Sequence, residues 1–357
     1  MRKFLFSCIG LLWLFSISLS CSDNSFDYVE IVNDTIVNKD TVIKTDTLIN
    51  TDSININDTI IKQDTIIVVD TIIVDANNTQ SDILLADPFI LNDGDYYYAY
   101  GTYDVGKGFG AYKSKDLYIW QWVGNVLLKE NTYASGKFWA PEVYKIDDTY
   151  YMFFAADRNL FVAKSDSPEG PFVQIGIKMI YKDGIDPHLF IEGDKKYLFF
   201  AKTRGNFSVW MGELNDDFLS MKEETIHECL SPKGWERFTN EGPFIYKHDN
   251  VYYLTYSGDG YQYQSYGVAV ATSFDIMGKW EKASYNPVLQ KREPWVGTGH
   301  HALFVDKNGE NRIVFHAHND KNSVHPRRMY IGKFHIDGNG VFKVDNEFII
   351  PKLIIKE

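Results

Sequence analysis

Five short segments of the chain place a carboxylate or an imidazole close to a proline or a second histidine, just before an apolar run. They recur roughly every 50 residues, and their polar members are Asp87, Glu142, Asp186, Glu241 and His300. Gathering four carboxylates and an imidazole costs free energy unless the groups pair, bind a cation or hold unequal protonation states. Carboxyl groups whose pKa values are pushed apart supply one acid and one base, so this set suits acid/base catalysis.

Each segment opens a repeating unit of short strands. An apolar strand is followed by a turn of Asp, Gly or Asn, an aromatic-rich second strand and a third strand, as in residues 86–90, 96–98 and 110–112. Five units of about four strands indicate a five-bladed β-propeller, in which the first strands line a central channel. A β-sandwich also has many short strands, but it does not predict a fivefold unit of this length. We therefore expect an all-β, five-bladed propeller over residues 81–357, with the five polar residues facing its channel.

The composition agrees with a globular body and excludes some functions. The 357 residues include 36 basic and 48 acidic side chains, a net charge of −12, which argues against a nucleic-acid binder. Aromatic residues make up 15% of the chain, a proportion that disordered chains do not carry. Of the three cysteines, only Cys229 lies in the body, so a disulfide framework is excluded.

The first 20 residues are typical of an export signal. Arg2 and Lys3 precede an apolar run over residues 4–19 that is short for a transmembrane helix. Cys21 follows directly, in a context that resembles the lipobox of bacterial lipoproteins, although Ser18 stands where leucine is usual. We expect lipidation of Cys21 and attachment to the bacterial outer membrane, on its periplasmic or cell-surface face; secretion is the alternative.

Residues 21–80 contain a hexapeptide repeat. Aspartates recur every six residues from Asp34 to Asp70, each followed by Thr or Ser and then by Ile, Val or Leu. An even period keeps every aspartate on one face of an extended chain and does not fit a helix. The segment has eleven acidic residues against three lysines, so its copies repel one another. It is predicted to be an extended stalk or linker, with a self-associating β structure as the alternative.

The motifs of the body resemble those of glycoside hydrolase family 43. They are Ala-Asp87-Pro, Trp139-Ala-Pro-Glu142, Ile-Asp186-Pro, Glu241-Gly-Pro and Gly-His300, in this order and spacing. The resemblance covers essentially all of residues 82–340. It implies an inverting glycosidase acting on arabinose- or xylose-containing glycans. Asp87 would be the general base and Glu241 the general acid, while Asp186 would raise the pKa of Glu241 and orient it.

Further residues are assigned to substrate binding. Trp139 offers a flat apolar ring to a sugar, and Phe89 and Glu142 are placed beside it. One of the two arginines before the third strand of the last unit should face the channel; strand alternation leads us to prefer Arg328 over Arg327. His300 matches the family's axial histidine, which implies either contact with the substrate or a structural calcium held through water, although calcium prefers oxygen ligands. No cofactor is expected to be required.

Substrate choice depends on loops that the sequence leaves open. Aromatic-rich insertions at 103–109, 205–207, 229–240 and 261–266 should wall the cavity. A blocked pocket would give an exo-acting α-L-arabinofuranosidase or β-xylosidase, which we favour, and a groove would give an endo-1,5-α-L-arabinanase. A galactan-directed enzyme and a catalytically silent carbohydrate-binding propeller are the remaining alternatives.

Overall fold

The computed structural model describes residues 78–356 apart from residue 206, together with six strands earlier in the chain. The export signal and Cys21 lie outside the described residues. The six early strands are β1 (Thr35–Asn38), β2 (Thr41–Lys44), β3 (Ile49–Asn50), β4 (Ser53–Asp58), β5 (Ile60–Ile61) and β6 (Ile67–Val74). They pair with one another, and β6 also runs parallel to an outer strand of the body, β29 (Phe342–Ile349). The assignment of the repeat as a stalk stays a prediction.

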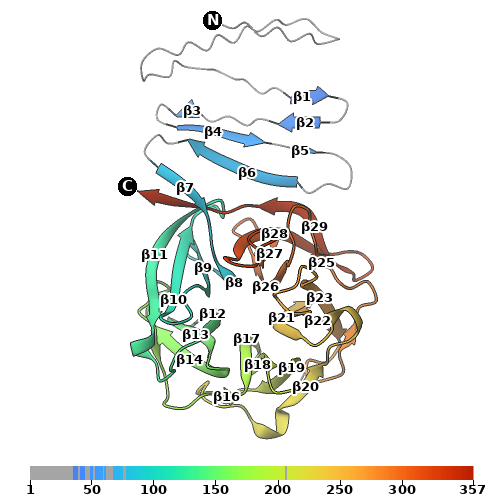
Figure 1. Ribbon diagram of the computed structural model, residues 1–357. Helices are drawn as coiled ribbons and strands as arrows, with labels where there is room; N and C mark the ends of the chain where they lie inside the picture. The colour runs from blue at the N-terminus through green and yellow to red at the C-terminus, as the bar shows by residue number, and fades with distance from the viewer. Residues whose placement is uncertain are drawn as a thin grey trace, which may run out of the picture.

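Five blades of antiparallel strands are arranged in a ring, as the predicted propeller requires (Figure 1). Blade one is β8 (Ala86–Asp93), β9 (Tyr96–Thr102), β10 (Gly108–Ser114) and β11 (Ile119–Leu128). Blade two is β12 (Phe138–Ile146), β13 (Thr149–Ala156), β14 (Asn159–Ser165) and β15 (Val173–Gln174), with β16 (Tyr181–Lys182) also paired to β14. Blade three is β17 (Gly184–Glu192), β18 (Lys195–Lys202), β19 (Ser208–Glu213) and β20 (His227–Leu230).

The last two blades complete the ring. Blade four is β21 (Asn240–His248), β22 (Val251–Gly258), β23 (Gly267–Ser273) and β24 (Glu281–Lys282), with β25 (Leu289–Gln290) also paired to β23. Blade five is β26 (Gly299–Val305), β27 (Asn311–Ala317), β28 (Arg328–Ile336) and β29. Each blade is one continuous stretch of chain, and the ring closes where β26 packs beside β8. Short 3-10 turns are η1 (Lys129–Asn131), η2 (Glu223–Thr225) and η3 (Gly234–Glu236).

The two ends of the body meet at the outer edge of blade one. The final strand β30 (Lys352–Lys356) runs parallel to β11 and antiparallel to β7 (Asn78–Asp82). Asp82 on β7 pairs with Lys352 at 3.1 Å and also with Arg328. None of the helices in the described part of the chain has the length and apolar character that a bilayer crossing needs.

Every inner strand carries a β-bulge at the same position near its start. The register shifts lie at 86/89, 139/142, 185/188, 241/244 and 299/302. At each bulge one residue has φ between 43° and 56°; these residues are Asp87, Ala140, Asp186, Gly242 and His300. A non-glycine residue in this left-handed region costs about 1–2 kcal/mol. Bulges re-aim side chains, and here they turn the strand starts into the channel.

Side chains from the preceding blade satisfy the backbone N–H groups that the bulges leave without a ladder partner. This arrangement occurs at four bulges, with donor–acceptor distances of 2.8–3.1 Å. The pairs are Ala140 N–H to Thr102 Oγ1, Gly242 N–H to Asp186 Oδ2, His300 N–H to Ser257 Oγ and Asp87 N–H to His316 Nδ1. The same contacts therefore hold the blades together and fix the polar residues around the channel.

Aromatic side chains fill the interfaces between blades. Phe109 on β10 packs edge-on against Phe138 and Phe154 of blade two, with ring centroids 5.7 and 5.6 Å apart, and all three rings are buried. Such pairs add about 0.5–1.5 kcal/mol each beyond their buried area. The aromatic richness of the sequence thus belongs largely to the packing that keeps the channel in shape.

Candidate active site

A cavity of about 430 Å³ lies at the bulged ends of the inner strands. Three carboxylates line it, Asp87, Asp186 and Glu241, and they come from blades one, three and four. The other lining residues are Trp139, Arg158, Ile185, Thr203, Phe207, Thr239, Gly260, Tyr261, Gln262, His300 and Arg327. The structure therefore brings together the three predicted catalytic carboxylates, Trp139 and His300.

Asp87 is surrounded by basic groups. Its Oδ1 accepts a hydrogen bond from Arg327 Nη1 at 2.8 Å and lies 3.3 Å from His300 Nδ1 and 3.4 Å from His316 Nδ1. Burial alone would raise the pKa of Asp87, but Arg327, the two histidines and Thr102 outweigh it and hold that pKa well below its usual value. Burial lowers the pKa of both histidines, so Arg327 carries the lasting positive charge. Asp87 is thus an ionised carboxylate, as a general base must be.

Glu241 has the opposite electrostatic environment. Its side chain is buried, and its Oε1 accepts a hydrogen bond from the Tyr266 hydroxyl at 2.8 Å. Burial raises the pKa of Glu241 to about 7, with a further contribution from the charge of Asp87, while Tyr266 and Arg327 oppose the increase. A carboxyl group with this pKa retains a proton near neutrality, as a general acid requires.

Asp186 holds the backbone beside Glu241. Its Oδ2 accepts the N–H of Gly242, the residue after Glu241, at 3.0 Å. Burial raises the pKa of Asp186, and the neighbouring charges of Glu241 and Asp87 raise it further. Because Asp186 and Glu241 interact strongly, they titrate as a pair that retains a proton to higher pH than either group would alone.

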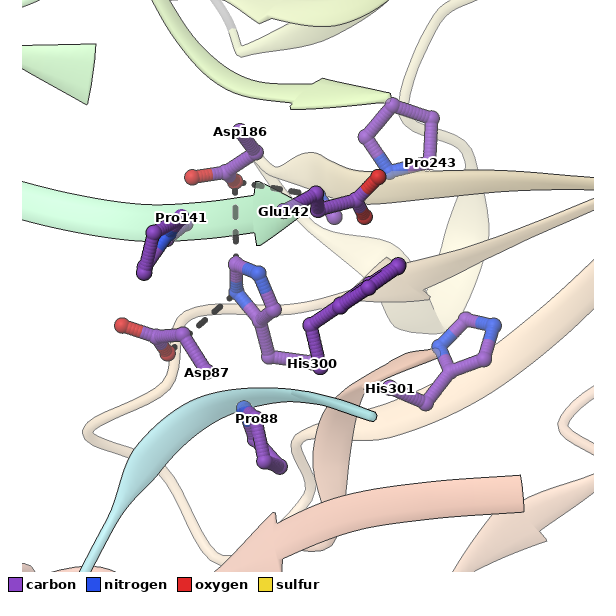
Figure 2. Close-up of a pocket in the computed structure, with 11 residues that line it drawn as sticks. Asp87, Pro88, Pro141, Glu142, Asp186, Pro243, His300 and His301 are labelled. Carbon is purple, nitrogen blue, oxygen red and sulfur yellow. Dashed lines mark hydrogen bonds and ion pairs between the residues drawn. The ribbon is translucent and has the colours of Figure 1, made fainter. Parts of the chain in front are cut away.

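The ring of His300 stands between two carboxylates. Figure 2 shows it between Asp87 and Asp186, whose oxygens lie 3.3 and 4.0 Å from Nδ1. The His300 ring also lies against Gly242, where an added Cβ would be 3.4 Å from the ring. His300 therefore separates the carboxylate of Asp87 from that of Asp186.

The side chains around His300 do not fit a calcium site. Calcium prefers about six to eight oxygen ligands, whereas His300 Nδ1 faces Asp87. The space beside His300, which Figure 2 shows with its lining residues, measures about 10 Å³, room for about one water molecule. Among the described residues, no three His, Cys, Asp or Glu side chains are grouped to share a metal ion. Direct ligation of calcium therefore receives no support from this geometry, and a calcium ion held through water stays a prediction.

Phe89 and Glu142 lie in this small space, and neither lines the larger cavity. The carboxylate of Glu142 accepts a hydrogen bond from Tyr144 and lies 2.9 Å from His188 Nδ1. Glu142 follows its bulge by two residues, so Ala140 occupies the position equivalent to Asp87. The prediction that Glu142 opens its strand as Asp87 does is therefore wrong, because proline and not the charged residue marks the repeat position.

The preference for Arg328 is also wrong. Arg327 lines the cavity and contacts Asp87, whereas Arg328 bonds to Asp82 and Asn319 on the other side of the chain. Strand β28 begins at Arg328, so Arg327 lies outside the strand and the alternation argument does not apply to it.

The cavity walls come from some of the expected insertions. Phe207, Thr239, Tyr261 and Gln262 line the cavity, as predicted for three of the four segments. The segment 103–109 contributes no lining residue, and part of the segment 229–240 forms strand β20.

Sequence reasoning missed Tyr266, His316, Ser257 and Thr102. The last three lie at the ends of second strands, which antiparallel pairing places beside the starts of the first strands. A polar residue near the end of the second strand in these three blades was thus the available signal. Tyr266 lies in a loop, and no periodic signal marks it.

The motifs, the propeller and the three carboxylates together agree with one family. Residues 78–342 match the family model described as glycosyl hydrolases family 43. The chain belongs to this family. An endo-1,4-beta-xylanase structure from Bacteroides thetaiotaomicron VPI-5482 is 37% identical, with a TM-score of 0.75 over 77% of this chain and 99% of that one.

Two named relatives extend the comparison. A xylosidase/arabinosidase of Butyrivibrio fibrisolvens is 26% identical over 268 residues, which cover 68% of this chain and 51% of the relative. A xylan 1,3-beta-xylosidase of a Vibrio species is 30% identical over 235 residues, 58% of this chain and 42% of the relative. The aligned part of the chain thus spans about half the length of these family 43 relatives.

Proposed function

We propose that the chain hydrolyses glycosidic bonds of xylose- or arabinose-containing glycans in one step, with inversion at the anomeric carbon. Asp87 takes a proton from the attacking water while Glu241 gives a proton to the departing oxygen. The observation that carries this proposal is the opposite surroundings of two carboxyl groups that line one cavity, basic groups around Asp87 and a buried site around Glu241. Arg327 helps to keep Asp87 ionised, and burial raises the pKa of Glu241 to about 7.

Asp186 acts on the acid without touching the transferred proton. It fixes the backbone at Gly242, and repulsion between its charge and that of Glu241 favours retention of one proton by the pair. Trp139 supplies an apolar ring at the cavity wall that suits the C–H face of a sugar. The names of the relatives support xylose and arabinose as the sugars.

We propose that cleavage takes place at chain ends. The cavity volume of about 430 Å³ lies in the lower part of the usual range for ligand sites, which suits a few sugar rings. The xylanase with 37% identity carries an endo name, so product size must be followed directly.

The test uses aryl xylopyranosides, aryl arabinofuranosides, linear arabinan and xylan. Proton NMR of the first products should show the inverted anomer. Single sugars should appear before any oligosaccharides. A retained anomer would reject the inverting mechanism, and early oligosaccharides would reject chain-end cleavage. Folded Asp87→Asn and Glu241→Gln variants with full activity on the glycans would reject the assignment of base and acid.

The proposed location is the bacterial outer membrane, through a lipid on Cys21. A Cys21→Ser variant should then leave the membrane fraction and appear in the soluble fraction. An unchanged membrane fraction would reject lipid anchoring.

A further inference from the structure

We propose that one loop, residues 259–266 between β22 and β23, positions both reacting carboxyl groups. Tyr266 of this loop holds the acid, Glu241. Tyr261 holds Arg327, which in turn contacts the base, Asp87. The inference rests on the proposed function, because it assigns new positioning residues to the same reaction. Gly260, Tyr261 and Gln262 of this loop line the cavity, so the loop also borders the substrate.

Tyr266 connects the acid to the base. Its hydroxyl donates to Glu241 Oε1 at 2.8 Å, and its ring stacks on His316 with centroids 5.7 Å apart and an interplanar angle of 14°. His316 Nδ1 in turn accepts the backbone N–H of Asp87. The tyrosine ring is fully buried and lies on Gly299, where an added Cβ would be 2.3 Å from it. This close packing leaves the hydroxyl little freedom to turn away from Glu241.

Tyr261 reaches the base through Arg327. The guanidinium carbon of Arg327 lies 4.8 Å from the centroid of the Tyr261 ring, while Nη1 of the same arginine donates to Asp87. A cation over an aromatic face is attracted by the ring electrons. The carbonyl oxygen of Tyr261 lies 2.7 Å from His318 Nε2, so the backbone at this tyrosine is also held.

The loop is anchored independently of these two contacts. Arg237 Nη2 pairs with Asp259 at 2.6 Å, and the Ser265 hydroxyl donates to the same carboxylate at 2.5 Å. The carbonyl of Ser265 accepts from Gln290, and that of Gln264 accepts the N–H of Gly297. Both ends of the loop are thus fixed, which lets its two tyrosines hold Glu241 and Arg327 in place.

The charged groups that face each carboxyl come from several strands. Glu241 is faced by Asp186 on β17, Asp87 on β8 and Arg327 before β28. Asp87 is faced by Arg327, His300 on β26 and His316 on β27. None of these groups belongs to the loop, so removing a loop hydroxyl or ring leaves all of them in the protein.

Tyr266→Phe tests the contact to the acid. In the native protein, the hydrogen bond from Tyr266 lowers the pKa of Glu241. The variant lacks this bond, so the pKa of Glu241 should be higher in it. The basic limb of the pH profile of kcat/KM should then move to higher pH, with KM almost unchanged. A merely structural role would admit water and move this limb to lower pH, because burial is the main cause of the raised pKa. An unmoved limb or a downward shift would overturn this part of the proposal.

Tyr261→Leu tests the contact to the base and changes a side chain that is partly exposed. Loss of the ring should loosen Arg327, raise the pKa of Asp87 and move the acidic limb to higher pH. Tyr261→Phe retains the ring and should leave that limb where it is in the native enzyme. Equal profiles for the leucine variant and the native protein would reject the role of Tyr261.

Tyr253→Phe is the matched control. It removes a buried hydroxyl that donates to the carbonyl of Gly340, outside the cavity, and should move neither limb.

A native protein inactive on every glycan would reject the proposed function. If the native protein is active and neither limb of the pH profile of kcat/KM moves in the Tyr266 and Tyr261 variants, only this inference is rejected. If Tyr266→Phe does not fold, the Tyr261 variants still decide the proposal for the base.

Discussion

The carboxylate of Asp186 accepts the backbone N–H of Gly242 at 3.0 Å, which ties the inner strand of blade three to the residue after Glu241. This contact lets one side chain fix the backbone beside Glu241 and also interact with the titration of that carboxyl group. Asparagine at position 186 keeps an oxygen for the N–H but removes the charge. Asp186→Asn therefore separates orientation from electrostatics.

In Asp186→Asn, Glu241 should release its proton at lower pH, because the repulsion between the two carboxylates that makes the pair retain one proton is gone. The basic limb of kcat/KM should move to lower pH, with kcat reduced at pH 7. Asp183→Asn, at the half-buried bend before β17, is the control and should leave the profile unchanged. A basic limb that stays in place in Asp186→Asn would contradict the charge effect.

The second prediction separates acid from base by the leaving group. Glu241→Gln should lose roughly 10²–10⁴-fold in kcat on xylo-oligosaccharides, but much less on aryl glycosides whose phenolate departs without a proton. Asp87→Asn should lose activity on both substrates, because water activation is needed for each. Comparison of kcat for the two variants on the two substrates provides the measurement. Equal losses of Glu241→Gln on both substrates would argue against its role as the acid.

The third prediction concerns two neighbouring arginines. Arg327→Met removes the permanent positive charge beside Asp87, so the pKa of Asp87 should rise and the acidic limb of kcat/KM should move to higher pH. Arg328→Met removes a partly exposed ion pair with Asp82 on β7, and such pairs contribute about 0–1 kcal/mol. It should leave the pH profile unchanged and lower the melting temperature slightly. The reverse pattern would show that Arg328 serves the site.

The fold and the gathering of three carboxylates in one cavity could be predicted because they depend on local repetition. Each inner strand begins with a turn residue and usually proline, and this spacing indicated five blades and placed Asp87 and Asp186 in the channel. Glu241 precedes its bulge residue by one position, yet its side chain still lines the cavity. Alignment by charge instead of by proline is what misplaced Glu142.

The contacts that tune the site could not be predicted in this way, because they join distant parts of the chain. Arg327 and Asp87 are 240 positions apart and meet only when blade five closes on blade one. Tyr266 reaches Glu241 from a loop whose path depends on its anchors at Asp259 and Ser265. Such contacts depend on the closure of the ring and on loop shape, neither of which leaves a periodic mark in the sequence.

The fourth prediction concerns Trp139 at the cavity wall. Trp139→Ala should weaken stacking on the sugar by about 1 kcal/mol, roughly a fivefold increase in KM for an aryl glycoside. Trp139→Phe should retain part of the stacking and give an intermediate KM. Trp122→Ala is the control, because Trp122 is an exposed tryptophan on the outer strand β11 that does not line the cavity. A KM that is unchanged in Trp139→Ala would remove this residue from substrate binding.

The last prediction connects catalysis to stability. Burial raises the pKa of Glu241 from 4.5 to about 7 in the folded protein. A raised pKa means that the folded state binds this proton more tightly than the unfolded state. The stability that comes from this proton is complete below about pH 4.5 and is lost as the pH rises through 7. A shift of this size corresponds to about 3 kcal/mol, so the native protein is less stable at pH 8 than its packing alone would allow.

Glu241→Gln removes the charge that is costly to bury at high pH. Its melting temperature should therefore increase relative to the native protein as the pH is raised from 5 to 8, while the exposed Glu281→Gln should show no such trend. Thermal unfolding of the three proteins at several pH values provides the measurement. A constant difference between Glu241→Gln and the native protein would mean that Glu241 titrates alike in the folded and unfolded states. Glu241 would then lose its proton well below neutral pH. The same burial that raises its pKa also makes its ionised form costly in the folded protein, so the two effects must occur together.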